Sequence, residues 1–155
     1  MIINKNSWYW NKDKSGNTVN HKGYEYGLIN DEKYNRIWLF SKDVNGIIKQ
    51  LWEHEALIGY AAFIIVEQNR LFAGVYPENS TGCLVVAIDL ISEDLLWEKP
   101  LKGLGSVGHS RYSNRVQLAF KEDQLIIYGW EAGGKYIEIL DPENGKLIEN
   151  NQLNY

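Results

Sequence analysis

The chain has 155 residues and a formal net charge of −4, from 16 basic and 20 acidic residues. This length predicts one domain with its own hydrophobic core, and a composition of 45 % hydrophobic and 23 % charged residues excludes a disordered chain. No apolar run reaches the roughly 18 residues that a membrane span requires, so we expect no membrane partner.

The N-terminal sequence and the cysteine content indicate the compartment. The first residues, MIINKNSWYWNKDK, lack the apolar stretch of about 7–15 residues found in a secretory signal. Cys83 is the only cysteine, which excludes an intramolecular disulfide and agrees with a reducing environment. One cysteine and three separated histidines offer no metal-ligand spacing. We therefore expect a cytoplasmic protein without a metal ion or other cofactor.

Short apolar and aromatic runs, separated by clusters of turn-forming residues, predict many β-strands. In chain order these runs are YEYGLI at 24–29, RIWLF at 36–40, RLFAGVY at 70–76, LVVAID at 84–89, RVQLAF at 115–120, QLIIYGW at 124–130 and KYIEIL at 135–140. The best helix candidate is 53–68. Its first half fits one or two helical turns, whereas its second half, AAFIIV, favours a buried strand. The pattern as a whole predicts an antiparallel all-β fold.

A four-strand pattern repeats over about 22–53, 62–101 and 116–153. In the second and third copies the third strand ends in an aspartate, Asp89 or Asp141, and a short turn leads to the last strand. The aspartate of the first copy is not clear. In DPENGK, we expect Asp141 to accept a hydrogen bond from a backbone N–H two residues on, which is a structural role.

The strand–Asp–turn–strand ending resembles one blade of a quinoprotein-like β-propeller. The matching residues are Ile88, Asp89, Leu96 and Trp97 in one copy, and Leu140, Asp141, Gly145, Leu147 and Ile148 in the other. A propeller closes with about four to eight blades, and this chain holds two or three. We therefore predict a single all-β domain over 1–155, with antiparallel sheets built from two or three blade-like repeats and arranged as an open partial propeller or a β-sandwich.

Charge is unevenly distributed along the chain. Residues 53–98 contain one basic and eight acidic residues, net −7, whereas residues 99–115 contain four basic and no acidic residues, net +4. Such blocks are candidate interaction surfaces, and the alternative is a solvated outer face. The candidate partner-binding residues are acidic side chains and aromatic residues near a strand end: Glu53, Glu55, Glu78, Glu93, Asp94, Tyr128, Trp130 and Glu131. The acidic balance disfavours a nucleic-acid partner.

No spacing of hydroxyl, thiol, histidine or carboxylate side chains is diagnostic of catalysis, so we do not expect an enzyme. In size, charge and composition the chain resembles small bacterial immunity proteins, which neutralise toxins delivered between cells. The resemblance implies a cytosolic protein that binds and inhibits a cognate basic toxin. The alternative is a small anionic-ligand-binding or enzymatic β domain that uses the basic loop 99–115, with His109, Arg111, Tyr112 and Arg115 facing a phosphate or carboxylate. That loop is otherwise a crossover between sheets.

Overall fold

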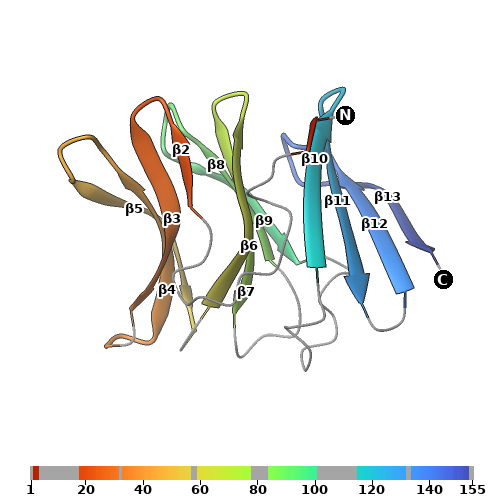
Figure 1. The fold of residues 1–155 in the computed structure, drawn as a ribbon, viewed down its shortest axis with the longest axis horizontal. Coiled ribbons are helices and arrows are strands. Elements are labelled where there is room, and N and C mark those ends of the chain that lie inside the picture. The colour runs from red at the N-terminus through yellow and green to blue at the C-terminus, as the bar shows by residue number, and fades with distance from the viewer. Residues whose placement is uncertain are drawn as a thin grey trace.

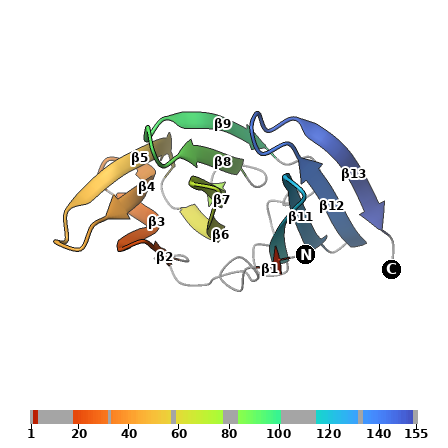
Figure 2. The same ribbon diagram turned by 90° about the horizontal axis from the view of Figure 1, so that it is seen from above.

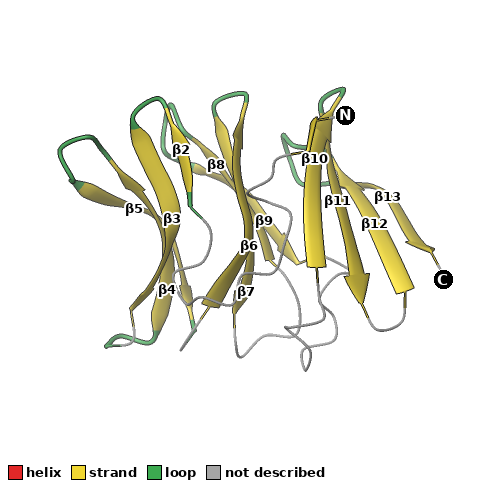
Figure 3. Cartoon of the chain, in the orientation of Figure 1, coloured by secondary structure: helices red, strands yellow, loops and turns green. Residues whose placement is uncertain are grey.

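The protein is represented by a computed structural model, which describes residues 2–3, 18–31, 33–56, 59–77, 84–100, 115–131 and 134–153. Within these ranges the chain forms thirteen β-strands and no helix (Figure 3). The strands form three antiparallel sheets, and these do not close into a barrel. The predicted all-β antiparallel fold is therefore confirmed, with three sheets rather than two.

Each sheet is a meander in which strands that follow one another in the sequence are paired. The first sheet contains β2 (Val19–His21), β3 (Tyr24–Asp31), β4 (Arg36–Lys42) and β5 (Ile48–Glu55). The second contains β6 (Gly59–Glu67), β7 (Arg70–Pro77), β8 (Leu84–Asp89) and β9 (Leu95–Pro100). The third contains β10 (Arg115–Lys121), β11 (Gln124–Glu131), β12 (Gly134–Leu140) and β13 (Leu147–Leu153), with β1 (Ile2–Ile3) paired to β10.

The expectation of one or two helical turns at the start of 53–68 is wrong. Glu53–Glu55 are the last residues of β5, where they pair with β4. The buried Trp52 anchors this strand, and ladder pairing overrides the weak local preference of the Glu-His-Glu sequence for a helix. The second half of the segment forms β6, as predicted.

The three sheets stand side by side and fan out in an arc (Figures 1 and 2). Strands β2, β6 and β10 lie on the inner side of the arc, and β6 contacts β2 and β3 in the first sheet and β10 in the third. Strands β5, β9 and β13 lie along the outer side. The second sheet is consequently covered on both faces.

The core consists of two apolar layers, one on each face of the second sheet. Leu71, Ala73 and Val75 join a buried cluster with first-sheet residues such as Leu28 and Leu39. On the opposite face, the Phe72 ring lies 6.2 Å from the ring of Trp97 and 6.1 Å from that of Phe120 in the third sheet. This double burial explains why β6, β7 and β8 of the second sheet are continuously apolar rather than alternating.

The turn between the third and fourth strands is built around an aspartate in all three sheets. The Asp89 carboxylate accepts hydrogen bonds from the backbone N–H groups of Ile91 and Ser92, at 2.7 and 3.1 Å. Asp141 accepts one from Glu143 at 2.9 Å, which confirms its predicted structural role. In the first sheet Asp43 takes this place, accepting from Asn45 and Ile47 at 2.9 Å each. The aspartate that was unclear in the first copy is therefore Asp43.

The first hairpin of each sheet also follows one pattern. Its two turn residues both have positive φ, as in the type I′ turns that match the twist of paired strands. The pairs are Lys22 and Gly23, Gln68 and Asn69, and Glu122 and Asp123. These turns and the three aspartate turns lie at one end of the molecule, uppermost in Figure 1, which we call the turn end. It comprises 22–23, 43–47, 68–69, 90–94, 122–123 and 141–146.

Candidate functional site: inter-sheet pockets at the turn end

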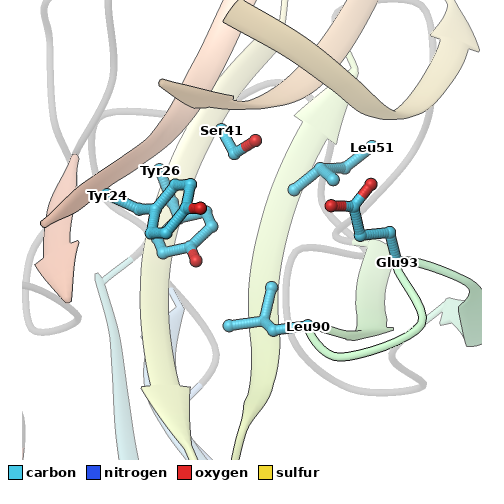
Figure 4. Close-up of a pocket in the computed structure, with 6 residues that line it drawn as sticks. All are labelled: Tyr24, Tyr26, Ser41, Leu51, Leu90 and Glu93. Atoms are coloured by element: carbon cyan, nitrogen blue, oxygen red, sulfur yellow. The ribbon is translucent and has the colours of Figure 1, made fainter. Parts of the chain in front are cut away.

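A pocket of about 90 Å³ opens at the turn end between the first and second sheets (Figure 4). Tyr24, Tyr26, Ser41 and Leu51 line it from the first sheet, and Leu90 and Glu93 from the β8–β9 turn. Tyr24 and Tyr26 are two residues apart on β3 and therefore share a face. Their rings are stacked, with centroids 6.2 Å apart and planes at 24°. The rings form one side of the pocket, and the Glu93 carboxylate lies opposite them.

Glu93 has an unusual backbone conformation. Its φ is +65°, in the left-handed region that favours glycine. Its N–H donates to the Asp89 carbonyl oxygen at 2.7 Å, as those of Gly46 and Gly145 do to the carbonyl oxygens of Asp43 and Asp141. The other two turns therefore have glycine at this position. A non-glycine residue here costs about 1–2 kcal/mol of backbone free energy.

The Glu93 carboxylate is already in contact with a cation from its own chain. Its Oε2 lies 2.7 Å from Nζ of Lys49 on β5. This hydrogen bond, and then the Glu93 charge, raise the pKa of Lys49 above its usual value. Both side chains remain substantially exposed, at 62 % for Lys49 and 40 % for Glu93. The ion pair is thus accessible from solvent.

The pocket disfavours negative charge. Burial raises the pKa of the Tyr26 phenol, and the nearby Tyr24 and Glu93 raise it further. Glu93 makes the smallest of these three contributions, and its carboxylate is already paired with Lys49.

A second pocket, of about 300 Å³, occupies the corresponding position between the second and third sheets. It is lined by Gln68, Arg70, Asp123, Asp141, Pro142 and Glu143. Here the Arg70 guanidinium lies over the Phe72 ring, 5.6 Å from its centroid. Arg70 also donates to the Gln68 side-chain oxygen, and Gln68 in turn donates to the Asp123 carboxylate at 2.8 Å.

The strand register makes the two pockets equivalent. In the second sheet, Arg70 pairs with the turn aspartate Asp89. In the first sheet, Glu25 pairs with Lys42, which places Tyr24 opposite the equivalent aspartate, Asp43. Tyr24 therefore corresponds in position to Arg70, and Tyr26, two residues further along its strand, corresponds to Phe72. Tyr24 and Tyr26 both line the first pocket, whereas Arg70 lines the second and Phe72 is buried under the Arg70 guanidinium.

Side chains of the outer strands fix how neighbouring sheets meet. Trp52 on β5 donates its indole N–H to the Glu98 carboxylate on β9, at 3.1 Å. Trp97 on β9 donates to the Pro142 carbonyl oxygen in the third sheet, at 2.9 Å. The Lys99 ammonium donates to the Gly145 carbonyl oxygen, also at 2.9 Å. These contacts set the distance between sheets, and hence the width of each pocket.

The structure divides the predicted acidic surface into two parts. Glu93 and Asp94 lie in the β8–β9 turn at the turn end. Glu53 and Glu55 lie at the far end of β5, and Glu53 is paired with Arg36 at 2.6 Å. Glu93 contacts Lys49 on β5, and at about 3.3 Å per residue Glu53 and Glu55 lie about 13 and 20 Å further along that strand. They do not form one continuous site.

The remaining candidate residues are placed only in part. Tyr128, Trp130 and Glu131 belong to β11, at the end opposite the turn end, and Arg115 begins β10, but their side chains lie outside the described ones. Glu78, His109, Arg111 and Tyr112 lie outside the described residues.

Tyr24 and Tyr26 of the first pocket were not selected as candidate site residues from the sequence, although their spacing indicated that they lie together. Tyr24 and Tyr26 stand in the motif YEY, in which strand periodicity places both rings on one face. Lys49 carried no such signal, because its contact with Glu93 joins two different sheets.

Comparison with known proteins gave no match from which a function could be transferred. No protein-family model matches this sequence, and no curated protein shows significant similarity to it. Among the described residues, no three His, Cys, Asp or Glu side chains are placed to hold a metal ion. In the same part of the chain there is no helix of the length and apolarity that a membrane span requires.

Proposed function

We propose that this chain is a non-enzymatic binding protein of the bacterial cytoplasm, an immunity protein that neutralises a basic toxin by covering its active site. The observation that carries the proposal is the turn end, where the β4–β5 and β8–β9 turns carry exposed apolar side chains. Val44, Ile47 and Ile91 are 81 %, 65 % and 80 % exposed. Soluble proteins seldom leave several large apolar side chains together in solvent unless another molecule covers them.

The composition of this surface resembles that of a protein–protein interface. Such interfaces combine an apolar centre with a charged rim that guides association. At the turn end and the adjoining outer strands, the exposed apolar residues are Val44, Ile47, Ile48, Ile91, Leu95, Leu96 and Ile148. Glu93 and Asp94 stand among them and supply the negative charge that attracts a basic partner.

The ion pair at the turn end is compatible with this role. Lys49 and Glu93 both have exposed side chains. An exposed pair of this kind contributes only about 0–1 kcal/mol, so a cation of the partner can replace Lys49 at little cost.

The proposal is tested by producing the chain together with the basic product of its neighbouring gene in a host that the latter kills. We expect the chain to restore growth. Ile91→Ser should weaken this protection, whereas Tyr34→Ser provides a matched control, because Tyr34 is also an exposed turn residue but lies at the opposite end. Growth arrest that persists with the unaltered, soluble chain would contradict the proposal.

A further inference from the structure

We propose that the pocket formed by Tyr24, Tyr26, Ser41 and Glu93 is a recognition site for a guanidinium group, the head of an arginine side chain. That the arginine belongs to a bound protein rests on the proposed function. Guanidinium recognition itself rests on the pocket and is measurable on the isolated chain.

The first argument is the internal comparison between the two pockets. In the second pocket the chain's own guanidinium, that of Arg70, lies over the Phe72 ring. The first pocket presents the equivalent ring, Tyr26, but has Tyr24 at the position of Arg70. In the first pocket the Tyr24 ring therefore stacks on Tyr26 where the Arg70 guanidinium lies over Phe72 in the second pocket. A guanidinium supplied from outside would stack on the exposed face of Tyr24 and extend this arrangement by one layer.

The second argument is the chemistry of Glu93. The corresponding turn positions are Gly46 and Gly145, so a glutamate is not needed to form the turn. It nevertheless occupies a strained left-handed conformation and directs a carboxylate toward the tyrosines. Lys49 engages Oε2, and a carboxylate accepts about four hydrogen bonds, so capacity remains for a second donor. A guanidinium is the group that binds a carboxylate with two parallel N–H bonds.

The third argument concerns shape and size. Stacked tyrosine rings present flat faces, and a planar guanidinium stacks on such faces better than a tetrahedral ammonium does. Tyr24 is 45 % exposed, so its ring is accessible from outside. The volume of about 90 Å³ is well below the roughly 300–1,000 Å³ of sites for whole small molecules. It suits one side-chain head group.

The test uses N-acetylarginine methylamide as the probe and the corresponding citrulline compound, its uncharged isostere, as the control. Each is titrated into the isolated chain while NMR records the aromatic signals of Tyr24 and Tyr26 and the Glu93 amide. We expect saturable shifts with the arginine probe and at least about tenfold weaker binding of the citrulline probe. Equal responses to both probes would overturn the site.

Variants sharpen the result. Glu93→Gly removes the carboxylate and relieves the left-handed strain, so the fold is preserved and probe affinity should fall at least about tenfold. Asp31→Asn, which changes an acidic residue at the opposite end of β3, should leave the affinity unchanged. Lys49→Gln removes the competing ammonium and should tighten binding by up to about fivefold. Unchanged affinity in Glu93→Gly would overturn the site.

The outcomes separate this inference from the proposed function. Probe binding without any basic protein partner would support the site and contradict the function. A partner bound equally well by the unaltered chain and by Glu93→Gly would support the function and contradict an arginine of that partner as the occupant of the pocket.

Discussion

Replacing Gly145 by alanine tests the packing between the second and third sheets. Gly145 has a φ of +73°, and an added Cβ would lie 2.6 Å from Cε3 and 2.7 Å from Cδ2 of Trp97. Trp97 is confined by its hydrogen bond to Pro142 and by the Phe72 ring, so it has little room to move. The backbone strain contributes about 1–2 kcal/mol and the overpacking about 1–3 kcal/mol. We expect Gly145→Ala to lower the free energy of unfolding by about 2–5 kcal/mol.

Gly46→Ala is the matched control. Gly46 occupies the same place in the first aspartate turn, with a φ of +82°, but an added Cβ would meet no atom within 4 Å. Its substitution therefore carries only the backbone contribution of about 1–2 kcal/mol. The difference between the two variants isolates the contact with Trp97.

Urea denaturation followed by tryptophan fluorescence and circular dichroism measures both variants against the unaltered chain. We expect Gly145→Ala to lose about 1–3 kcal/mol more than Gly46→Ala, with similar denaturant slopes. Equal losses in the two variants would refute the proposed packing of Trp97 on this turn.

Three further predictions concern the turns, the sheet junction and pH. Asp89→Ala should destabilise the fold by about 1–2 kcal/mol in urea denaturation, whereas Asp89→Asn, which keeps an acceptor oxygen, should lose less. Trp97→Phe leaves the buried Pro142 carbonyl without its donor, and calorimetry should show a lower melting temperature. The raised pKa values of Tyr26 and Lys49 mean that the folded chain holds these protons more tightly than the unfolded chain, whose groups titrate near 10.0 and 10.5. Their contribution to stability is complete below about pH 10 and is lost as the pH rises through the pKa values of the folded state. Tyr26→Phe should make the free energy of unfolding fall less steeply with pH in this range. An unchanged dependence on pH would contradict the raised pKa of Tyr26.

The strands were predictable because their sequences carry the pattern that burial imposes. The runs of β6, β7 and β8 are apolar on both faces, since a sheet lies against each face of the second sheet. Asp43 was harder to identify as the third aspartate. It follows the polar pair Ser41–Lys42, whereas Asp89 and Asp141 follow apolar residues. The role of Asp43 depends on its own carboxylate, which accepts hydrogen bonds from backbone N–H groups of the turn. The residues before it therefore did not help to identify it.

The site was less predictable, because it depends on contacts between sheets. The acidic block in the sequence included Glu93, but the pairing of Glu93 with Lys49 joins different sheets and could not be read from it. The register of β4 and β5 places Arg36 opposite Glu55, and the Arg36 guanidinium forms an ion pair with Glu53, two residues away on the same face, which neutralises another member of the block. The sequence does not reveal that Glu93 adopts a left-handed backbone conformation. This follows from the structure, in which Glu93 holds the turn position that Gly46 and Gly145 hold in the other two sheets.

The most direct test of the proposed function is calorimetric titration of the purified chain into the purified basic product of the neighbouring gene, at low and at high ionic strength. The account predicts a saturable complex whose affinity falls as salt increases and falls again in Ile91→Ser, because charge guides association and the turn end forms the contact. No binding, or binding that neither salt nor Ile91→Ser weakens, would contradict the account.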